Sequence, residues 1–183
     1  MFKKDFIYPE MMIHVPLCTN KDPKNITILS NDAKPFIQEI NKHTEIAHEA
    51  VAPTLEAIGK VADKSADVIV CEAPFDAALL AHINRIAKDD AQLVLTHPSL
   101  DNVEENKTIM QILANYFKII MPYNLGNGNT ALFCSKEYHP TADIILQRSD
   151  MLDELNYYNC DVHVAAFAMP NFIRKEYLGI IKN

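Results

Sequence analysis

Glycine is scarce in this chain: the 183 residues include only four, at positions 59, 126, 128 and 179. Loops that bring a backbone close to a phosphate or a nucleoside need residues without a Cβ atom. The sequence also contains neither a G-x-S-x-G motif nor a phosphate-binding P-loop pattern. Acyl hydrolysis and nucleoside triphosphate chemistry therefore have no support.

Other signals that would point to a different class of protein are missing as well. No run of about eighteen apolar residues occurs, and the start M-F-K-K-D-F lacks a signal-peptide core, so we expect a soluble protein. The net charge is −7 without a basic cluster, which argues against nucleic acid and anionic membranes as partners. The four cysteines show no C-x-x-C spacing. They predict reduced thiols and a cytoplasmic location.

Histidine is present but scattered. The seven histidines form no H-x-x-x-H or H-E-x-x-H pair, so we expect no metal site. His14 and His163 are interpreted as hydrogen-bonded structural residues, with a role as base or ligand as the alternative.

Short apolar runs alternate with amphipathic stretches along most of the chain. We expect strands at 25–29, 67–71, 92–96, 117–121 and 130–135, with an ambiguous one at 44–49. We expect helices at 8–18, 32–40, 51–62, 76–87, 101–116 and 140–155, then a loop-and-cap segment at 157–175. The fold class is therefore α/β: a Rossmann-like mixed sheet of the S-adenosylmethionine-methyltransferase type, with helices on both faces and a closing antiparallel hairpin. Residues 1–183 are expected to form one domain.

The stretch S-A-D-V-I-V-C-E-A-P-F-D at 65–76 is the most informative segment. Its β-branched run is typical of a strand buried on both faces of a parallel sheet. Glu72 and Asp76 follow this strand, at the edge where open α/β sheets bind ligands. Asp76 also fits the N-cap of the next helix, and position alone leaves both interpretations open.

Two blocks resemble a known family. The segment D-F-I-Y-P-E-M-M-I-H-V-P-L at 5–17 resembles the D-F-I-Y-H-E-M-M-x-H-V-P-L block of polyamine aminopropyltransferases, the spermidine synthases. The segment Y-Y-N-C-D-V-H-V-A-A-F-A-M-P at 157–170 resembles their Y-Y-N-x-x-x-H-x-A-A-F-A-L-P block. The resemblance spans nearly all of the chain. We expect no counterpart of the amino-terminal β-domain that is usual in the family.

The resemblance implies aminopropyl transfer. Decarboxylated S-adenosylmethionine would be the co-substrate, putrescine or a related small cationic diamine the acceptor, and methylthioadenosine the by-product. No permanently bound cofactor is expected. The resemblance also implies a homodimer.

The resemblance carries over to this chain unevenly. It places the catalytic carboxylate on Glu72 and implies that Tyr8, Asp76 and Tyr123 hold the diamine. Asp32 and Glu49 are the candidates for the nucleoside. The family's G-G-G-D-G loop is replaced by S-N-D-A-K at 30–34, where a turn using a left-handed Asn or Asp is one way to continue the chain. The alternative function is a non-catalytic homologue that has lost co-substrate binding and acts as a binding or interaction protein.

Overall fold

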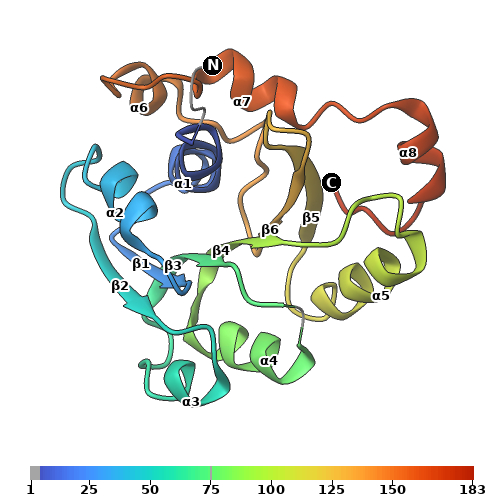
Figure 1. The fold of residues 1–183 in the computed structure, drawn as a ribbon, viewed down its shortest axis with the longest axis horizontal. Helices are drawn as coiled ribbons and strands as arrows, with labels where there is room; N and C mark the ends of the chain where they lie inside the picture. The colour runs from blue at the N-terminus through green and yellow to red at the C-terminus, as the bar shows by residue number, and fades with distance from the viewer. Residues whose placement is uncertain (1–4, 75) are drawn as a thin grey trace.

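The computed structural model describes residues 5–74 and 76–183, and its centre is a six-stranded sheet (Figure 1). The strand order is β2-β1-β3-β4-β6-β5. Strands β1 to β4 run parallel, and β6 pairs antiparallel with both β4 and β5. The bounds are β1 Asn25–Leu29, β2 Ala47–Val51, β3 Ala66–Cys71, β4 Ala87–Thr96, β5 Ile119–Asn124 and β6 Thr130–Ser135. The predicted mixed sheet with its closing hairpin is confirmed.

Helices cover both faces of this sheet, as predicted (Figure 1). One face packs against α1 (Ile7–Thr19), α2 (Lys34–Ile40) and α7 (Cys160–Ala166). The opposite face packs against α3 (Leu55–Ile58), α4 (Ala77–Ile86), α5 (Val103–Leu113) and α8 (Asn171–Glu176). Helix α6 (Leu146–Asp150) lies against α1 and α7. No helix in the described ranges is long and apolar enough to cross a bilayer.

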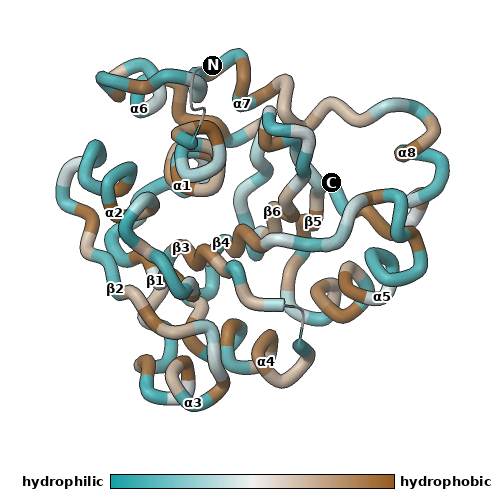
Figure 2. The backbone as a smooth tube through the Cα atoms, viewed as in Figure 1, coloured by the Kyte–Doolittle hydropathy of each residue, from teal (hydrophilic) through white to brown (hydrophobic). Residues whose placement is uncertain are grey.

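Strand β3 is buried at every position, as its sequence predicts. Successive side chains of a strand point to opposite faces, so Val68 and Val70 join one core while Ile69 and Cys71 join the other. Figure 2 shows the hydrophobic colour concentrated along β3 and β4. The residues directly after β3 are therefore placed by a rigid, central strand.

Helix α1 runs through the core, and every residue in it except Tyr8 is buried. The helix predicted at 8–18 is confirmed within one residue at each end, and it continues past Pro16 to Thr19. A helix that is buried on all sides must satisfy its polar side chains internally. Glu10 does so by accepting three backbone hydrogen bonds from residues 156–158.

Several predicted bounds differ from the structure. Strand β4 begins five residues before the predicted position, with a register shift in its pairing to β3, and β2 and β5 are displaced toward the carboxyl end. Strand ends depend on the pairing partner, which the local pattern does not reveal. The helix predicted at 51–62 is only α3, and the one at 140–155 is only α6.

The segment 157–175 differs most from its prediction as a loop-and-cap region, since it contains α7 and α8. The Asn159 side chain caps α7 by accepting a hydrogen bond of 2.8 Å from the Val162 amide. Such a cap stabilises a helix too short to be recognised by its periodicity.

Candidate functional site

Glu72 stands directly after β3, at the carboxyl edge of the sheet, and is half-buried. Its amide donates a hydrogen bond of 2.9 Å to the Leu29 carbonyl, so its backbone continues the pairing of β3 with β1. Its carboxylate accepts a hydrogen bond of 2.8 Å from the Tyr8 hydroxyl on one oxygen and another from the Ser30 hydroxyl on the other oxygen. Backbone and side chain together hold the carboxylate in one orientation.

Tyr8 reaches Glu72 from the first turn of α1, where it is the only residue that is not buried. Burial and the neighbouring Glu72 carboxylate raise the pKa of Tyr8 well above the ordinary value for a tyrosine. The phenol therefore stays protonated at neutral pH and acts as the donor in its bond to Glu72.

Ser30 follows β1 and is only 7% exposed. Besides donating to Glu72, its hydroxyl accepts a hydrogen bond of 2.9 Å from the Asp32 amide. The Asp32 carboxylate in turn accepts a bond of 3.3 Å from the Lys34 amide. Side-chain hydrogen bonds thus shape this turn, and neither Asn31 nor Asp32 adopts a positive φ. The left-handed turn considered for this segment is not used.

A pocket of about 400 Å³ opens beside Tyr8. It lies at the carboxyl end of β4, between the loop leading to α5 and the β5–β6 turn. Its lining residues are Tyr8, Thr96, His97, Ser99, Leu100, Asp101, Leu125, Gly128, Asn129 and Thr130. The pocket therefore shares Tyr8 with the fixed carboxylate of Glu72.

The other residues expected to hold a diamine lie elsewhere. Asp76 is exposed and caps α4 by accepting a hydrogen bond of 2.9 Å from the Leu79 amide. It lines a different hollow, of about 260 Å³, after β2 and β3. Tyr123 is fully buried, and its hydroxyl donates to the Met11 carbonyl at 3.3 Å. The structure does not bring Asp76 or Tyr123 into the pocket beside Tyr8.

The two nucleoside candidates are also separated. Asp32 is exposed just after β1, at the same edge as Glu72. Glu49 is exposed within β2, opposite Thr27 and two residues before the strand ends. It borders a small hollow of about 130 Å³ together with residues that begin β1. Glu49 is therefore not at the carboxyl edge where a nucleoside would lie.

Three residues at this edge were not singled out from the sequence: Ser30, His97 and Asp101. His97 and Asp101 follow β4 as Glu72 follows β3, so the rule that ligands bind at carboxyl strand ends was the available signal. The role of Ser30 could not be predicted from the sequence, because its position corresponds to a glycine of the family's loop and has no side-chain function there.

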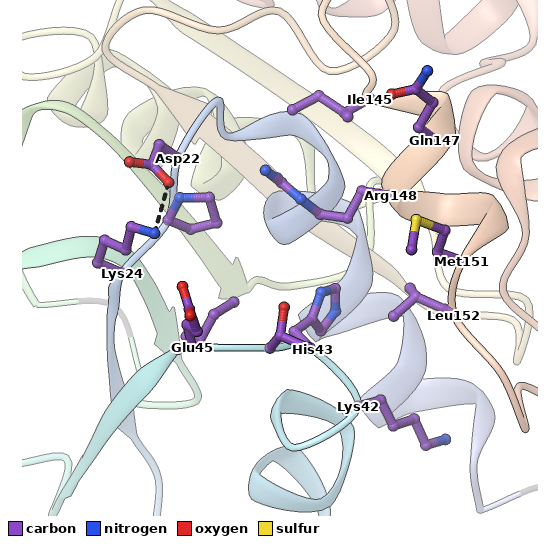
Figure 3. Close-up of a pocket in the computed structure, with 13 residues that line it drawn as sticks. Asp22, Lys24, Lys42, His43, Glu45, Ile145, Gln147, Arg148, Met151 and Leu152 are labelled. Carbon is purple, nitrogen blue, oxygen red and sulfur yellow. Dashed lines mark ion pairs between the residues drawn. The ribbon is translucent and has the colours of Figure 1, made fainter.

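A separate pocket of about 410 Å³ lies between α2, α6 and the segment entering β1 (Figure 3). Its cations already have partners: Lys24 pairs with Asp22, and Arg148 donates to the carbonyls of Leu17 and Asn20 at the end of α1. In Figure 3 the His43 imidazole points toward Arg148.

The histidines of the two family-like blocks are hydrogen-bonded, as their structural interpretation requires. His14 is fully buried and lies 2.9 Å from the Glu39 carboxylate through Nε2 and 2.9 Å from His43 through Nδ1. His163 is held between the Tyr158 hydroxyl and the Pro140 carbonyl. Within the described ranges, no group of three or more His, Cys, Asp or Glu residues is arranged to hold a metal ion.

Comparison with known proteins gives this geometry a context. No protein-family model matches the chain. The polyamine aminopropyltransferase of Helicobacter acinonychis is 30% identical over 118 residues, which cover 61% of this chain and 45% of the relative. The enzyme of the same name from Helicobacter pylori strain G27 is 22% identical over 218 residues, which cover 98% of this chain and 80% of the relative. The chain is similar to polyamine aminopropyltransferases. The resemblance seen in the two sequence blocks is confirmed.

Solved structures agree with this similarity at the level of the fold. A spermidine synthase in complex with the transition-state analogue AdoDATO superposes with a TM-score of 0.82 at 22% identity, covering 94% of this chain and 75% of the other. A phosphoethanolamine N-methyltransferase from Haemonchus contortus gives a TM-score of 0.52 at 13% identity, covering 75% and 39% of the two chains. The Rossmann-like fold of the methyltransferase type is thereby confirmed.

Proposed function

We propose that this chain transfers an aminopropyl group from decarboxylated S-adenosylmethionine to putrescine or a related diamine, with Glu72 as the general base. The observation that carries the proposal is the fixed carboxylate of Glu72, which shares Tyr8 with a pocket at the carboxyl edge of the sheet. The similarity to polyamine aminopropyltransferases supplies the reaction class.

The chemistry needs an unprotonated amine and a group that accepts its proton. The amine nitrogen attacks the methylene carbon beside the sulfonium, a C–N bond forms, and the C–S electron pair returns to sulfur, releasing methylthioadenosine. The proton lost by the attacking nitrogen passes to the Glu72 carboxylate. General-base catalysis of this kind requires the carboxylate within hydrogen-bond reach of the amine, and Glu72 is connected to the pocket through its hydrogen bond from Tyr8, which lines it.

The co-substrate is assigned to the opposite side of Glu72. Asp32 follows β1 there, and the hollow lined by Asp76 and Pro74 follows β3. In open α/β sheets a nucleoside lies across such strand ends. Asp76 would then border the nucleoside and not the diamine, and Glu49 would contribute only through a displacement of β2.

A non-catalytic binding protein is the second candidate, and one observation favours it. Ser30, whose hydroxyl is hydrogen-bonded to Glu72, stands where the family's glycine loop begins. A Cβ at this position hinders close approach of a nucleoside to the backbone. The homodimer, the cytoplasmic location and the single domain at 1–183 stay predictions.

The deciding experiment is incubation with decarboxylated S-adenosylmethionine and putrescine, followed by mass spectrometry for methylthioadenosine. We expect product from the wild type and loss of at least about a hundredfold in Glu72→Gln. Glu56→Gln is the matched control, because Glu56 is an exposed carboxylate on α3 that pairs with Lys60 and lies outside the site. Absence of product, together with no thermal shift from the nucleoside, would rule out the transferase.

A further inference from the structure

The loop between β4 and α5, residues 97–101, is held more firmly than its surface position requires. Asn106 is fully buried in α5, and its amide nitrogen donates to the carbonyls of Pro98 at 3.2 Å and Ser99 at 2.8 Å. The buried Tyr177 hydroxyl donates to the Leu100 carbonyl at 2.6 Å. Burying polar groups is costly unless they are bonded, so these contacts fix the loop and preorganise one wall of the pocket beside Tyr8.

His97 belongs to the same network, and its partners define its protonation. Because the Asn106 nitrogen already donates, its oxygen is the acceptor and faces His97 Nδ1 at 2.7 Å. Nδ1 therefore carries the proton, and Nε2 accepts from the Thr130 hydroxyl at 2.9 Å. Burial also lowers the pKa of His97. The imidazole is neutral and adds no positive charge to the pocket.

The formal charge of the pocket then comes from a single side chain. Among the described residues that line it, Asp101 is the only carboxylate, and none is a lysine or an arginine. Asp101 is exposed, and its carboxylate accepts a hydrogen bond of 3.3 Å from the Ser99 hydroxyl. Leu100 and Leu125 supply apolar surface in the same lining. A pocket whose described lining combines one carboxylate, neutral polar groups and two leucines, without a lysine or an arginine, suits an ammonium on a short methylene chain.

We propose that Asp101 binds the distal ammonium of the acceptor and so makes the site selective for diamines over monoamines. The inference rests on the proposed function for the position of the reacting amine, at the end of the pocket lined by Tyr8, whose hydroxyl is bonded to Glu72. The distal amine is thereby assigned to the loop after β4. Glu72 and Asp76 lie in a different loop, the one after β3.

Binding can be measured without turnover, which separates this proposal from the proposed reaction. Calorimetric titration of the full chain compares putrescine with n-butylamine, which has the same four carbons but no second ammonium. We expect the wild type to prefer putrescine by roughly tenfold, the usual effect of a hydrogen bond to a charged group. Asp101→Asn should remove that preference while leaving the affinity for n-butylamine unchanged.

Glu105→Gln is the matched control. Glu105 is an exposed carboxylate in the first turn of α5, four residues after Asp101, and it does not line the pocket. Its loss therefore reproduces any effect of charge on the helix dipole and should leave the preference for putrescine intact. A preference that survives in Asp101→Asn, or is missing from the wild type, overturns the proposal. Selective binding without methylthioadenosine production upholds Asp101 and refutes only the transferase.

Discussion

The Tyr8 hydroxyl lies 2.8 Å from a carboxylate oxygen of Glu72, although the two residues are 64 positions apart in the chain. This hydrogen bond joins the start of α1 to the end of β3. Because Tyr8 also lines the pocket, the proposed reaction would bring an acceptor amine and the proposed base together at one side chain. The geometry of the site thus depends on how α1 is seated in the core.

Tyr8→Phe tests this dependence. Removing the hydroxyl leaves one Glu72 oxygen without its donor, so we expect a loss of about tenfold in kcat and of about 1 kcal/mol in stability. Methylthioadenosine formation and thermal denaturation measure the two effects. Tyr138→Phe removes a similar hydroxyl, which donates to Asp90 at 3.0 Å away from the site, and should leave kcat unchanged. Equal kcat values in both variants would contradict this role of Tyr8.

Glu10 connects the two family-like blocks of the sequence. It is fully buried in α1, and its carboxylate accepts the amides of Asn156, Tyr157 and Tyr158 at 3.0, 2.9 and 2.8 Å. In Glu10→Gln an amide NH₂ would face one or more of these donors, so we expect a loss of about 2–3 kcal/mol. Urea denaturation measures it.

The control for Glu10 is Glu137→Gln, which removes an exposed carboxylate that pairs with Lys118. An exposed pair contributes at most about 1 kcal/mol, so this variant should be close to the wild type in stability. If Glu10→Gln were as stable as Glu137→Gln, the carboxylate would not be the link between the two blocks.

Gly126 in the β5–β6 turn lies against Tyr157. Its φ is +79°, and a Cβ added there would lie 2.0 Å from the Tyr157 hydroxyl oxygen. Gly128 has a φ of +93° but open space around the same position. Both alanine variants are strained by their φ, at about 1 kcal/mol each. Only Gly126→Ala also displaces the tyrosine, so its melting temperature should fall further than that of Gly128→Ala. Equal losses would show that the ring moves freely.

The central part of the fold could be predicted from the sequence, because burial and periodicity determine it. The bounds of β1 and β6 agree with the structure, and Glu72 stands where the end of β3 was expected. The start of β4 and the length of α3 could not be predicted in the same way. They depend on pairing and packing with distant residues, which local propensity does not contain.

The candidate site could be predicted only in part for a related reason. The sequence pattern predicts that Tyr8 lies in the first helix and that Glu72 follows a central strand. Whether a residue reaches the site also depends on the direction of its side chain. Tyr123 pairs with Ala131 and points toward α1, so it is buried. Asp101 lies in the loop after β4 and lines the same pocket as Tyr8 of α1. This placement depends on how α1 packs against the sheet, and no sequence motif indicates it.

His43 supports a prediction about pH. Its Nε2 lies 2.9 Å from His14 Nδ1, and His14 Nε2 faces the Glu39 carboxylate at 2.9 Å. Burial, His14 and Arg148 lower the pKa of His43 from 6.5 to about 3, although Glu39 acts in the opposite direction. Between these two values the unfolded chain binds a proton that the folded protein does not, so His43 makes the folded state less stable as the pH falls.

His43→Gln should therefore change the pH dependence of stability and not only its level. Glutamine keeps an N–H donor for His14 but takes up no proton, so the stability lost on acidification from pH 7.5 to 4.5 should be smaller than in the wild type. Chemical denaturation across this range measures the difference. His48→Gln is the control, because His48 is exposed on β2. Its stability should fall with pH by the same amount as that of the wild type. If the stability of His43→Gln fell with pH as much as that of the wild type, His43 would be protonated equally in the folded and unfolded chains. Its burial beside His14 would then not keep it neutral.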